Sequence, residues 1–273
     1  MSRSYRTVFI SDLHLGMRGC QSGEAARFLE HLRCEKLYLV GDILDLWWLK
    51  RRWHWPECHG RIVRRIFELA EAGTEVIFVP GNHDEAVRQY AQHEFAGVKV
   101  RRWDVHHTVD GRRLLVTHGD EFVCPLAGPR WLSRWGGTAY RWLVHVNHHY
   151  NRLRRRLGLR YWSLSRFVKL RLRRASALIG RFEQALVAET KRRGFDGVVC
   201  GHIHKAEQRI EDGIAYFNCG DWLESCTALV EHACGRMQIL EGAMLDEQVR
   251  SLRASHEAGS DVKLSDVRES VAS

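Results

Sequence analysis

The chain has 273 residues, of which 45% are hydrophobic, so it can form one large domain with a buried core, and disorder throughout is excluded. No stretch approaches the ~20 apolar residues that cross a bilayer, and the first residues lack a signal-peptide apolar region, so we expect a cytoplasmic protein. The formal net charge of +9 at pH 7 indicates an anionic partner such as a phosphate compound, a nucleic acid or a membrane surface. None of the eight cysteines form a C-x-x-C pair, which argues against structural zinc.

Short apolar runs of strand length recur along most of the chain. They lie at 7–11, 36–42, 75–81, 112–120, 196–204, 214–222, 226–232 and 236–242. Helix-length segments at 23–34 and 61–73 separate the first three runs, and the second segment ends in a glycine that suits a helix C-terminus. This alternation predicts an α/β fold with a mostly buried sheet.

A basic segment interrupts the strand pattern. From about 123 to 193 the strand signals vanish and the sequence is typical of helices, with 17 basic residues between Arg130 and Arg193 and only two acidic ones, Glu183 and Glu189. We therefore predict a core over 1–122 and 194–245, a helical cap insertion over 123–193, and a disordered tail over 246–273.

Polar side chains beside glycines follow five of the apolar runs. The clusters are "SDLH" with Asp12 and His14, "GDILD" with Asp42, "GNHD" with Asn82 and His83, "THGD" with His118, and "GHIH" with His202 and His204. A single cluster is more often a turn or a helix cap, but five of them at strand ends indicate one shared crevice, because α/β folds bind ligands there. Mixed oxygen and imidazole ligands suit manganese, iron or zinc better than calcium or magnesium, and their number suggests two ions.

These five motifs, in this order, resemble the calcineurin-like metallophosphoesterase superfamily over residues 7 to 242. The resemblance implies a four-layer αββα sandwich and a centre of two divalent metal ions, with Mn(II) favoured and iron or zinc as alternatives. It also implies the ligand sets: Asp12, His14 and His204 for one ion, Asn82, His118 and His202 for the other, and Asp42 bridging both.

Such a centre predicts phosphoester hydrolysis by activated water, with the ions neutralising the charge that builds on phosphorus. The leaving oxygen needs a proton donor, for which His83 is the candidate. We expect Asp84 to orient the His83 imidazole, and Asp45 and Asp120 to support the metal ligands.

Within the superfamily, "SDLHLG", "GDILDLWW" and the helical insertion are similar to the UDP-2,3-diacylglucosamine hydrolases of lipid A synthesis. That resemblance implies hydrolysis of a pyrophosphate to UMP and 2,3-diacylglucosamine 1-phosphate, by an enzyme peripheral to the cytoplasmic face of the inner membrane. Aromatic residues and leucines alternate with arginines in the insertion, as in helices that rest on an anionic membrane, although packing on the core explains them equally well. Trp47 and Trp48 either form an apolar wall beside the site or pack in the core.

One motif departs from that enzyme group, which carries "GNRD" where this chain has "GNHD" at 81–84. The difference allows a related lipid or nucleotide phosphodiester as the substrate. Two further alternatives are a metal-dependent nuclease that binds nucleic acid through the basic insertion, and a non-catalytic scaffold. The sequence leaves the oligomeric state open.

Overall fold

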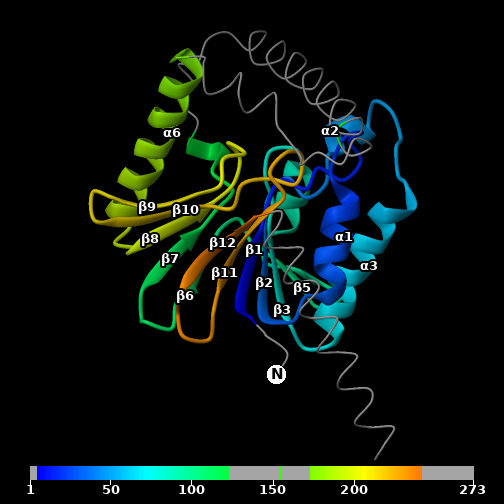
Figure 1. Cartoon of the computed structure of the whole chain (residues 1–273), viewed down its shortest axis with the longest axis horizontal. Helices are drawn as coiled ribbons and strands as arrows, with labels where there is room; N and C mark the ends of the chain where they lie inside the picture. The colour runs from blue at the N-terminus through cyan, green and yellow to red at the C-terminus, as the bar shows by residue number, and fades with distance from the viewer. Residues whose placement is uncertain (1–4, 123–153, 155–172, 242–273) are drawn as a thin grey trace, which may run out of the picture.

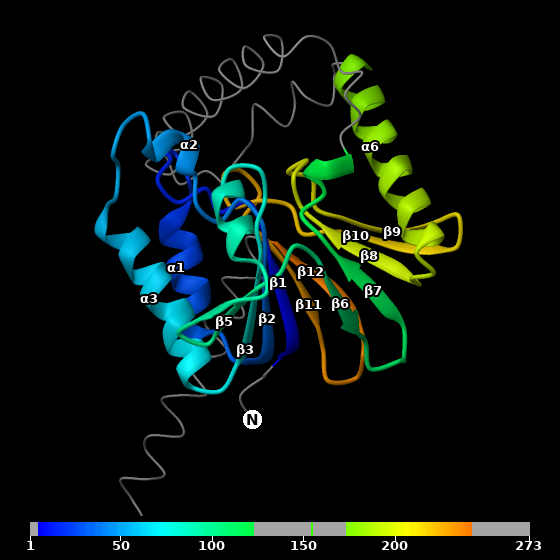
Figure 2. The ribbon, with the colours of Figure 1, turned by 180° about the vertical axis from the view of Figure 1, so that it is seen from behind.

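Two β-sheets pack face to face between helices (Figure 1). The computed structural model describes residues 5–122, 154 and 173–241. Helices α1 (Ser22–His31) and α3 (Glu57–Glu71) flank the first sheet, and α6 (Arg173–Arg192) lies on the far side of the second (Figure 2). These layers confirm the predicted αββα arrangement.

The first sheet has seven strands in the order β12-β11-β1-β2-β3-β5-β4. Strands β1, β2, β3 and β5 run parallel, whereas β11, β12 and β4 run antiparallel to their neighbours. The strands are β1 (Tyr5–Ile10), β2 (Cys34–Val40), β3 (Glu75–Val79), β4 (Glu94–Phe95), β5 (Val98–Val100), β11 (Thr227–Glu231) and β12 (Met237–Glu241). The carboxyl ends of β1, β2 and β3 therefore meet at one edge of this sheet.

The second sheet has five strands in the order β6-β7-β8-β10-β9, with β7, β8 and β10 parallel. Its strands are β6 (Asp104–His107), β7 (Arg113–Val116), β8 (Gly197–Cys200), β9 (Glu207–Glu211) and β10 (Ile214–Asn218). All eight apolar runs identified in the sequence form strands, although each strand is shorter than its run or shifted by one or two residues. Four further strands, β4, β5, β6 and β9, were not predicted.

Short helical segments complete the loops around the upper rim in Figure 1. They are α2 (Leu46–Leu49) and the 3-10 helices η1 (Glu85–Tyr90) and η2 (Asp120–Phe122). The longer α3 begins earlier than the sequence predicts and buries Ile62, Ile66 and Leu69 along one face. Gly73, which follows it with a φ of +96°, ends this helix as predicted.

Three apolar cores separate the four layers. Ile62 packs between the helices and the first sheet, Phe9 and Val199 pack between the two sheets, and Phe182 and Leu186 of α6 pack on the outer face of the second sheet. Each sheet is thus covered on both faces, which explains why its central strands are continuous apolar runs rather than alternating ones.

Most of the predicted insertion, 123–193, lies outside the described residues, as does the predicted tail, 246–273. The last part of the insertion forms α6, and its Phe182 and Leu186 are buried against the second sheet. This part of the segment therefore belongs to the core packing, and the remaining domain boundaries stay predictions.

A buried ionic cluster joins the two sheets. Glu231 of β11 is fully buried and accepts hydrogen bonds from Arg6 at 2.9 Å, from Nε2 of His106 at 2.8 Å and from the backbone N–H of Val109 at 2.9 Å. His106 and Val109 belong to the second sheet and the turn that follows β6, whereas Glu231 and Arg6 belong to the first. The carboxylate therefore fixes one sheet against the other.

We expect Glu231→Gln to lower the free energy of unfolding at pH 7 by about 2–3 kcal/mol, because Arg6 and His106 lose their charged partner. Burial raises the pKa of Glu231, but the His106 bond and its other donors lower it below the ordinary value of 4.5. This stabilisation is therefore complete above pH 4.5 and is lost as the pH falls through the folded-state pKa. Urea unfolding at pH 7 and below pH 4.5 measures the difference.

The matched control is Glu94→Gln, which changes the same group on the exposed strand β4. This substitution should change the unfolding free energy by less than about 0.5 kcal/mol. A loss for Glu231→Gln that is no larger than that of Glu94→Gln would contradict the structural role of the cluster.

Candidate metal centre

Loops from both sheets meet at the carboxyl ends of five strands. These loops carry all the predicted metal ligands and both predicted catalytic residues: Asp12 and His14 after β1, Asp42 after β2, Asn82, His83 and Asp84 after β3, His118 after β7, and His202 and His204 after β8. Asp12, His14, Asp42, Asp84 and His118 are buried. The predicted crevice is therefore assembled from three strands of the first sheet and two of the second.

The backbone at this edge is strained. Five of the predicted ligands have a positive φ, from 49° to 70°, a conformation that costs energy for residues other than glycine; they are Asp12, His14, Asp42, His202 and His204. Gly81 leaves room between the loops, because a Cβ atom there would overlap the side chains of Asp42 and His118. These loops can approach one another only with this backbone and this glycine.

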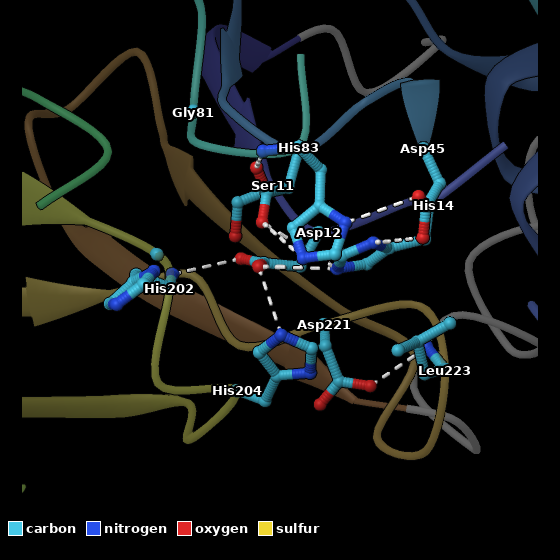
Figure 3. Close-up of polar contacts among 12 residues, drawn as sticks. Ser11, Asp12, His14, Asp45, Gly81, His83, His202, His204, Asp221 and Leu223 are labelled. Carbon is cyan, nitrogen blue, oxygen red and sulfur yellow. Dashed lines mark hydrogen bonds and ion pairs between the residues drawn. The ribbon is translucent and has the colours of Figure 1, made fainter. Parts of the chain in front are cut away.

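Asp12, His14 and His204 form the first ligand group (Figure 3). Nε2 of His204 lies 3.1 Å from Oδ1 of Asp12, and Nε2 of His14 lies 3.7 Å from the same oxygen. One ligand atom from each of the three residues falls within 4.8 Å of the others, which is close enough to surround one ion.

Asp42, His118 and His202 form the second ligand group. Nε2 of His118 lies 3.4 Å from Oδ2 of Asp42, and Nε2 of His14 in the first group lies 3.7 Å from that same oxygen. Asp42 therefore faces both groups. Nδ1 of His118 donates to the carbonyl of Val40 at 2.9 Å, which turns Nε2 toward Asp42.

The pairing of buried polar atoms tests whether these residues fit metal ions. Among the described residues, Nε2 of His14, Oδ1 of Asn82 and Nε2 of His118 are buried and have no hydrogen-bond partner. Buried polar atoms are nearly always paired, so three unpaired ligand atoms at one place indicate that cations satisfy them. The residues present fit a centre for divalent ions.

Electrostatics keep the carboxylates ready to bind cations. Burial raises the pKa of Asp42, but the neighbouring His118 outweighs it and holds the net value well below the ordinary one. Burial and the charge of His118 lower the pKa of His202 to about 4, so this imidazole is neutral at pH 7. Burial lowers the pKa of His118 but Asp42 raises it, to about 10 overall, so ion binding at His118 must release a proton.

His83 lies beside the ligands, and its carboxylate partner differs from the one we expected. Nδ1 of His83 lies 3.2 Å from Oδ1 of Asp45, and its Nε2 lies 4.0 Å from Oδ2 of Asp42. Asp45 also lies 3.4 Å from Nδ1 of His14, so one carboxylate contacts both a predicted metal ligand and the candidate acid (Figure 3). The predicted support of a ligand by Asp45 agrees with this contact.

Asp84 does not make the contact with His83 that we expected. Its carboxylate binds backbone N–H groups instead. Its carboxylate accepts from the N–H groups of Gly81 at 2.6 Å, Ile43 at 2.8 Å and Leu44 at 3.2 Å. A buried carboxylate needs donors, and the two loops supply them where the His83 ring does not. Burial and the charge of Asp42 raise the pKa of Asp84 to about 6.

Asp120 also differs from its expected role. It forms an ion pair with Arg88 at 2.6 Å, and its effect on His118 is electrostatic: its negative charge helps to raise the pKa of that imidazole.

The sequence analysis missed the loop after β10, which supports the site from the second sheet. Nδ2 of Asn218 donates to the carbonyl of Gly201 at 2.8 Å, and the N–H of Trp222 donates to the carbonyl of Asp12 at 3.1 Å. Asp221 holds this loop by accepting from the N–H of Leu223 at 2.8 Å (Figure 3). The signal was present as "NCGDW", a further polar and glycine cluster at the end of an apolar run.

A four-layer αββα sandwich whose strand ends gather histidines, aspartates and an asparagine defines a class of metal-binding phosphoesterase folds. The model of the calcineurin-like phosphoesterase family matches residues 5–206. The chain belongs to that family, as the resemblance in its motifs implied.

Several relatives share one name, UDP-2,3-diacylglucosamine hydrolase. The relative from Porphyromonas gingivalis is 32% identical over 123 residues, which cover 42% of this chain and 46% of the relative. The relative from Edwardsiella ictaluri is 25% identical over 73% of this chain and 76% of its own length. The relative from Ralstonia nicotianae is 27% identical over 78% of this chain and 82% of its own length. The chain spans about half the length of the first two relatives, from Porphyromonas gingivalis and Serratia proteamaculans.

Proposed function

We propose that the protein is a metal-dependent hydrolase of the pyrophosphate in UDP-2,3-diacylglucosamine or in a related nucleotide-linked lipid. The observation that carries the proposal is the pair of ligand groups that share Asp42. The names of the relatives support the substrate class. His83, where the lipid A hydrolases are expected to have arginine, is the reason that related lipids are included.

We extend the two groups to full ligand sets, adding Asn82 because its Oδ1 is buried without a hydrogen-bond partner among the described residues. Asp12, His14 and His204 would hold one ion, Asn82, His118 and His202 the other, and Asp42 would contact both. Divalent ions, Mn(II) foremost, would supply the Lewis-acid charge that activates water and stabilises the phosphoryl oxygens. The split of the ligands between two ions is part of the proposal.

His83 then has a separate task in the proposed reaction. Asp45 contacts its Nδ1, which leaves Nε2 facing the ligand cluster, where it can donate a proton to the departing oxygen. Trp47 packs on the His83 ring with centroids 4.3 Å apart and restricts its orientation. The proposed acid therefore has both a carboxylate neighbour and an aromatic neighbour, which supports this role.

Substrate turnover tests the proposal directly. The purified full chain with Mn(II) should convert UDP-2,3-diacylglucosamine to UMP and 2,3-diacylglucosamine 1-phosphate, both identified by mass spectrometry. Parallel reactions with single-stranded DNA and with bis-p-nitrophenyl phosphate identify the alternatives. Cleavage of DNA without cleavage of the lipid would favour a nuclease, and no hydrolysis of any substrate would favour a scaffold.

Chelation provides a second test, which does not depend on the lipid. Removing divalent ions should abolish hydrolysis of bis-p-nitrophenyl phosphate and lower the melting temperature, because His14, Asn82 and His118 then keep unpaired buried atoms. Adding Mn(II) should restore both properties, as followed by rate and by differential scanning fluorimetry. Full activity in a chain shown to be metal-free would contradict the metal-dependent mechanism.

The membrane location is also part of the proposal. None of the described helices is both long and apolar enough to cross a membrane. A peripheral position at the cytoplasmic face of the inner membrane would bring the enzyme to a lipid-linked substrate.

A further inference from the structure

An exposed loop at the rim of the metal centre combines tryptophans with basic residues. We call residues 46–56, from α2 to the start of α3, the tryptophan-arginine loop. Lys50, Arg51, Arg52 and Trp53 are exposed, and no acidic residue lies within the loop. Trp53 has 74% of its surface exposed, which is unusual for so large an apolar side chain.

The loop is anchored to the core, and this packing fixes Trp53 in its exposed position. Trp55 packs against the core between the helices and the first sheet, and its ring lies 5.3 Å from that of His59 in α3. Trp53 stacks on Trp55 with centroids 6.0 Å apart and an angle of 28° between the rings. The partly buried tryptophan thus holds the exposed one out toward solvent.

Among the described residues, none neutralises the positive charge of the loop. In the described part of the chain, Lys50, Arg51 and Arg52 make no ion pair. Burial first, and then the charges of Arg18 and Arg52, lower the pKa of His54, which shows that Arg18 adds to the same positive field. This surface is therefore complementary to an anionic one.

The loop is continuous with the proposed active centre. Trp47 at its beginning is 41% exposed and packs on His83. Asp45, which contacts both His14 and His83, accepts from the N–H of Trp48 at 2.8 Å and so starts α2. Whatever binds the loop is held next to the metal centre.

We propose that the tryptophan-arginine loop binds the anionic surface of a phospholipid membrane and holds the metal centre at the level of the lipid headgroups. Tryptophan favours the membrane interface because it is large and apolar with one polar N–H group, and arginines are attracted to anionic headgroups. The inference deepens the proposed function, and it rests on that function only for the lipid nature of the substrate. Nucleic acid could use the same residue types, but the lipid-linked substrate of the relatives favours the membrane.

The chain offers a matched control for this surface. The order Arg-Arg-Trp occurs twice, at 51–53 and at 101–103. At the second position Trp103 is less exposed, at 45%, and has two neighbours: Cζ of Arg193 lies 5.5 Å from its ring centroid and the ring of Phe195 lies at 6.5 Å. The two triplets carry the same charge and the same aromatic group, but only the first borders His83.

The experiment compares two triple variants of the full chain, R51Q/R52Q/W53S and R101Q/R102Q/W103S, by flotation with vesicles. Wild type should bind phosphatidylcholine vesicles that contain 30% phosphatidylglycerol and should bind pure phosphatidylcholine at least about tenfold more weakly. The 51–53 variant should lose at least about tenfold in affinity for the anionic vesicles, and the 101–103 variant should bind like wild type. Melting temperatures confirm that each variant is folded.

Three results would overturn the inference: equal vesicle binding by wild type and the 51–53 variant, equal loss in both variants, or a loss of binding to single-stranded DNA with vesicle binding unchanged. Turnover of UDP-2,3-diacylglucosamine dispersed in detergent separates this inference from the proposed function, because no membrane surface is needed there. Wild type that binds anionic vesicles but leaves the dispersed lipid intact would refute the substrate and keep the docking surface. Turnover of the dispersed lipid by wild type that does not bind vesicles would support the substrate and refute the docking surface.

Discussion

Replacing His118 by alanine is expected to lower both the bound metal and the hydrolytic rate by at least about a hundredfold, since even the loss of a ligand's hydrogen-bond partner costs 10–100-fold in such sites. Nε2 of His118 is buried, has no hydrogen-bond partner among the described residues, and lies in an ion pair 3.4 Å from the oxygen of Asp42 that faces both ligand groups. Its removal takes one ligand from the second group and the charge that keeps the pKa of Asp42 low. Metal content per chain by mass spectrometry and the rate with bis-p-nitrophenyl phosphate measure the two losses.

The control for this variant is His106→Ala, which removes another buried histidine but touches no predicted ligand. Both variants should lose stability, because each leaves a buried carboxylate without its partner. Only His118→Ala should lose metal. A His118→Ala protein that keeps its full metal content would refute the assignment of this residue as a ligand.

Replacing His83 by alanine should have a different signature. We expect the metal content to stay at the wild-type level while kcat for the lipid substrate falls by about 10²–10⁴-fold, the range of general acid catalysis. The reason is geometric: Nδ1 of His83 is 3.2 Å from Asp45, and His83 belongs to neither of the two groups assigned to the ions, although it lies with His14 and Asp45 in a third group of possible ligands. Steady-state kinetics on metal-replete protein measure the effect.

Two substrates with different leaving groups distinguish the loss of an acid catalyst from structural damage to the site. A p-nitrophenolate leaves as a stable anion and needs little protonation, so His83→Ala should slow bis-p-nitrophenyl phosphate far less than it slows the lipid substrate. A structural defect would slow both substrates alike. Wild-type turnover of the lipid by the metal-replete variant would remove His83 from the mechanism.

Strand position was predictable where both faces of a strand are buried. The run "TVFIS" marks β1 because its side chains enter the core on either side, as Val8 and Phe9 do. Three of the strands that were missed, β4, β6 and β9, lie at sheet edges. An edge strand has one neighbour and less burial, so Ile210 of β9 is 79% exposed and the sequence "EQRIE" carries no apolar run.

The meeting of Asp12 and His14 in one crevice was predictable from the position of strand ends, whereas the division of the residues into two ligand sets was implied by the family resemblance and stays a prediction. The partner of His83 was not predictable, since it depends on how two loops face each other across the crevice. Asp84 is adjacent in sequence but is occupied by backbone N–H groups, whereas Asp45 approaches from the loop after β2. Sequence adjacency identifies candidates, and only the arrangement of the loops selects among them.

The left-handed backbone at five of the predicted ligands has a consequence for the evolution of this chain. Each such residue costs of order 1–3 kcal/mol and persists only because the surrounding loops enforce it. Stability and activity therefore favour different residues at these positions. Glycine there would remove the backbone strain, but it would also remove a side chain that is proposed to bind an ion. Descendants selected for heat resistance alone would drift toward inactive, more durable proteins.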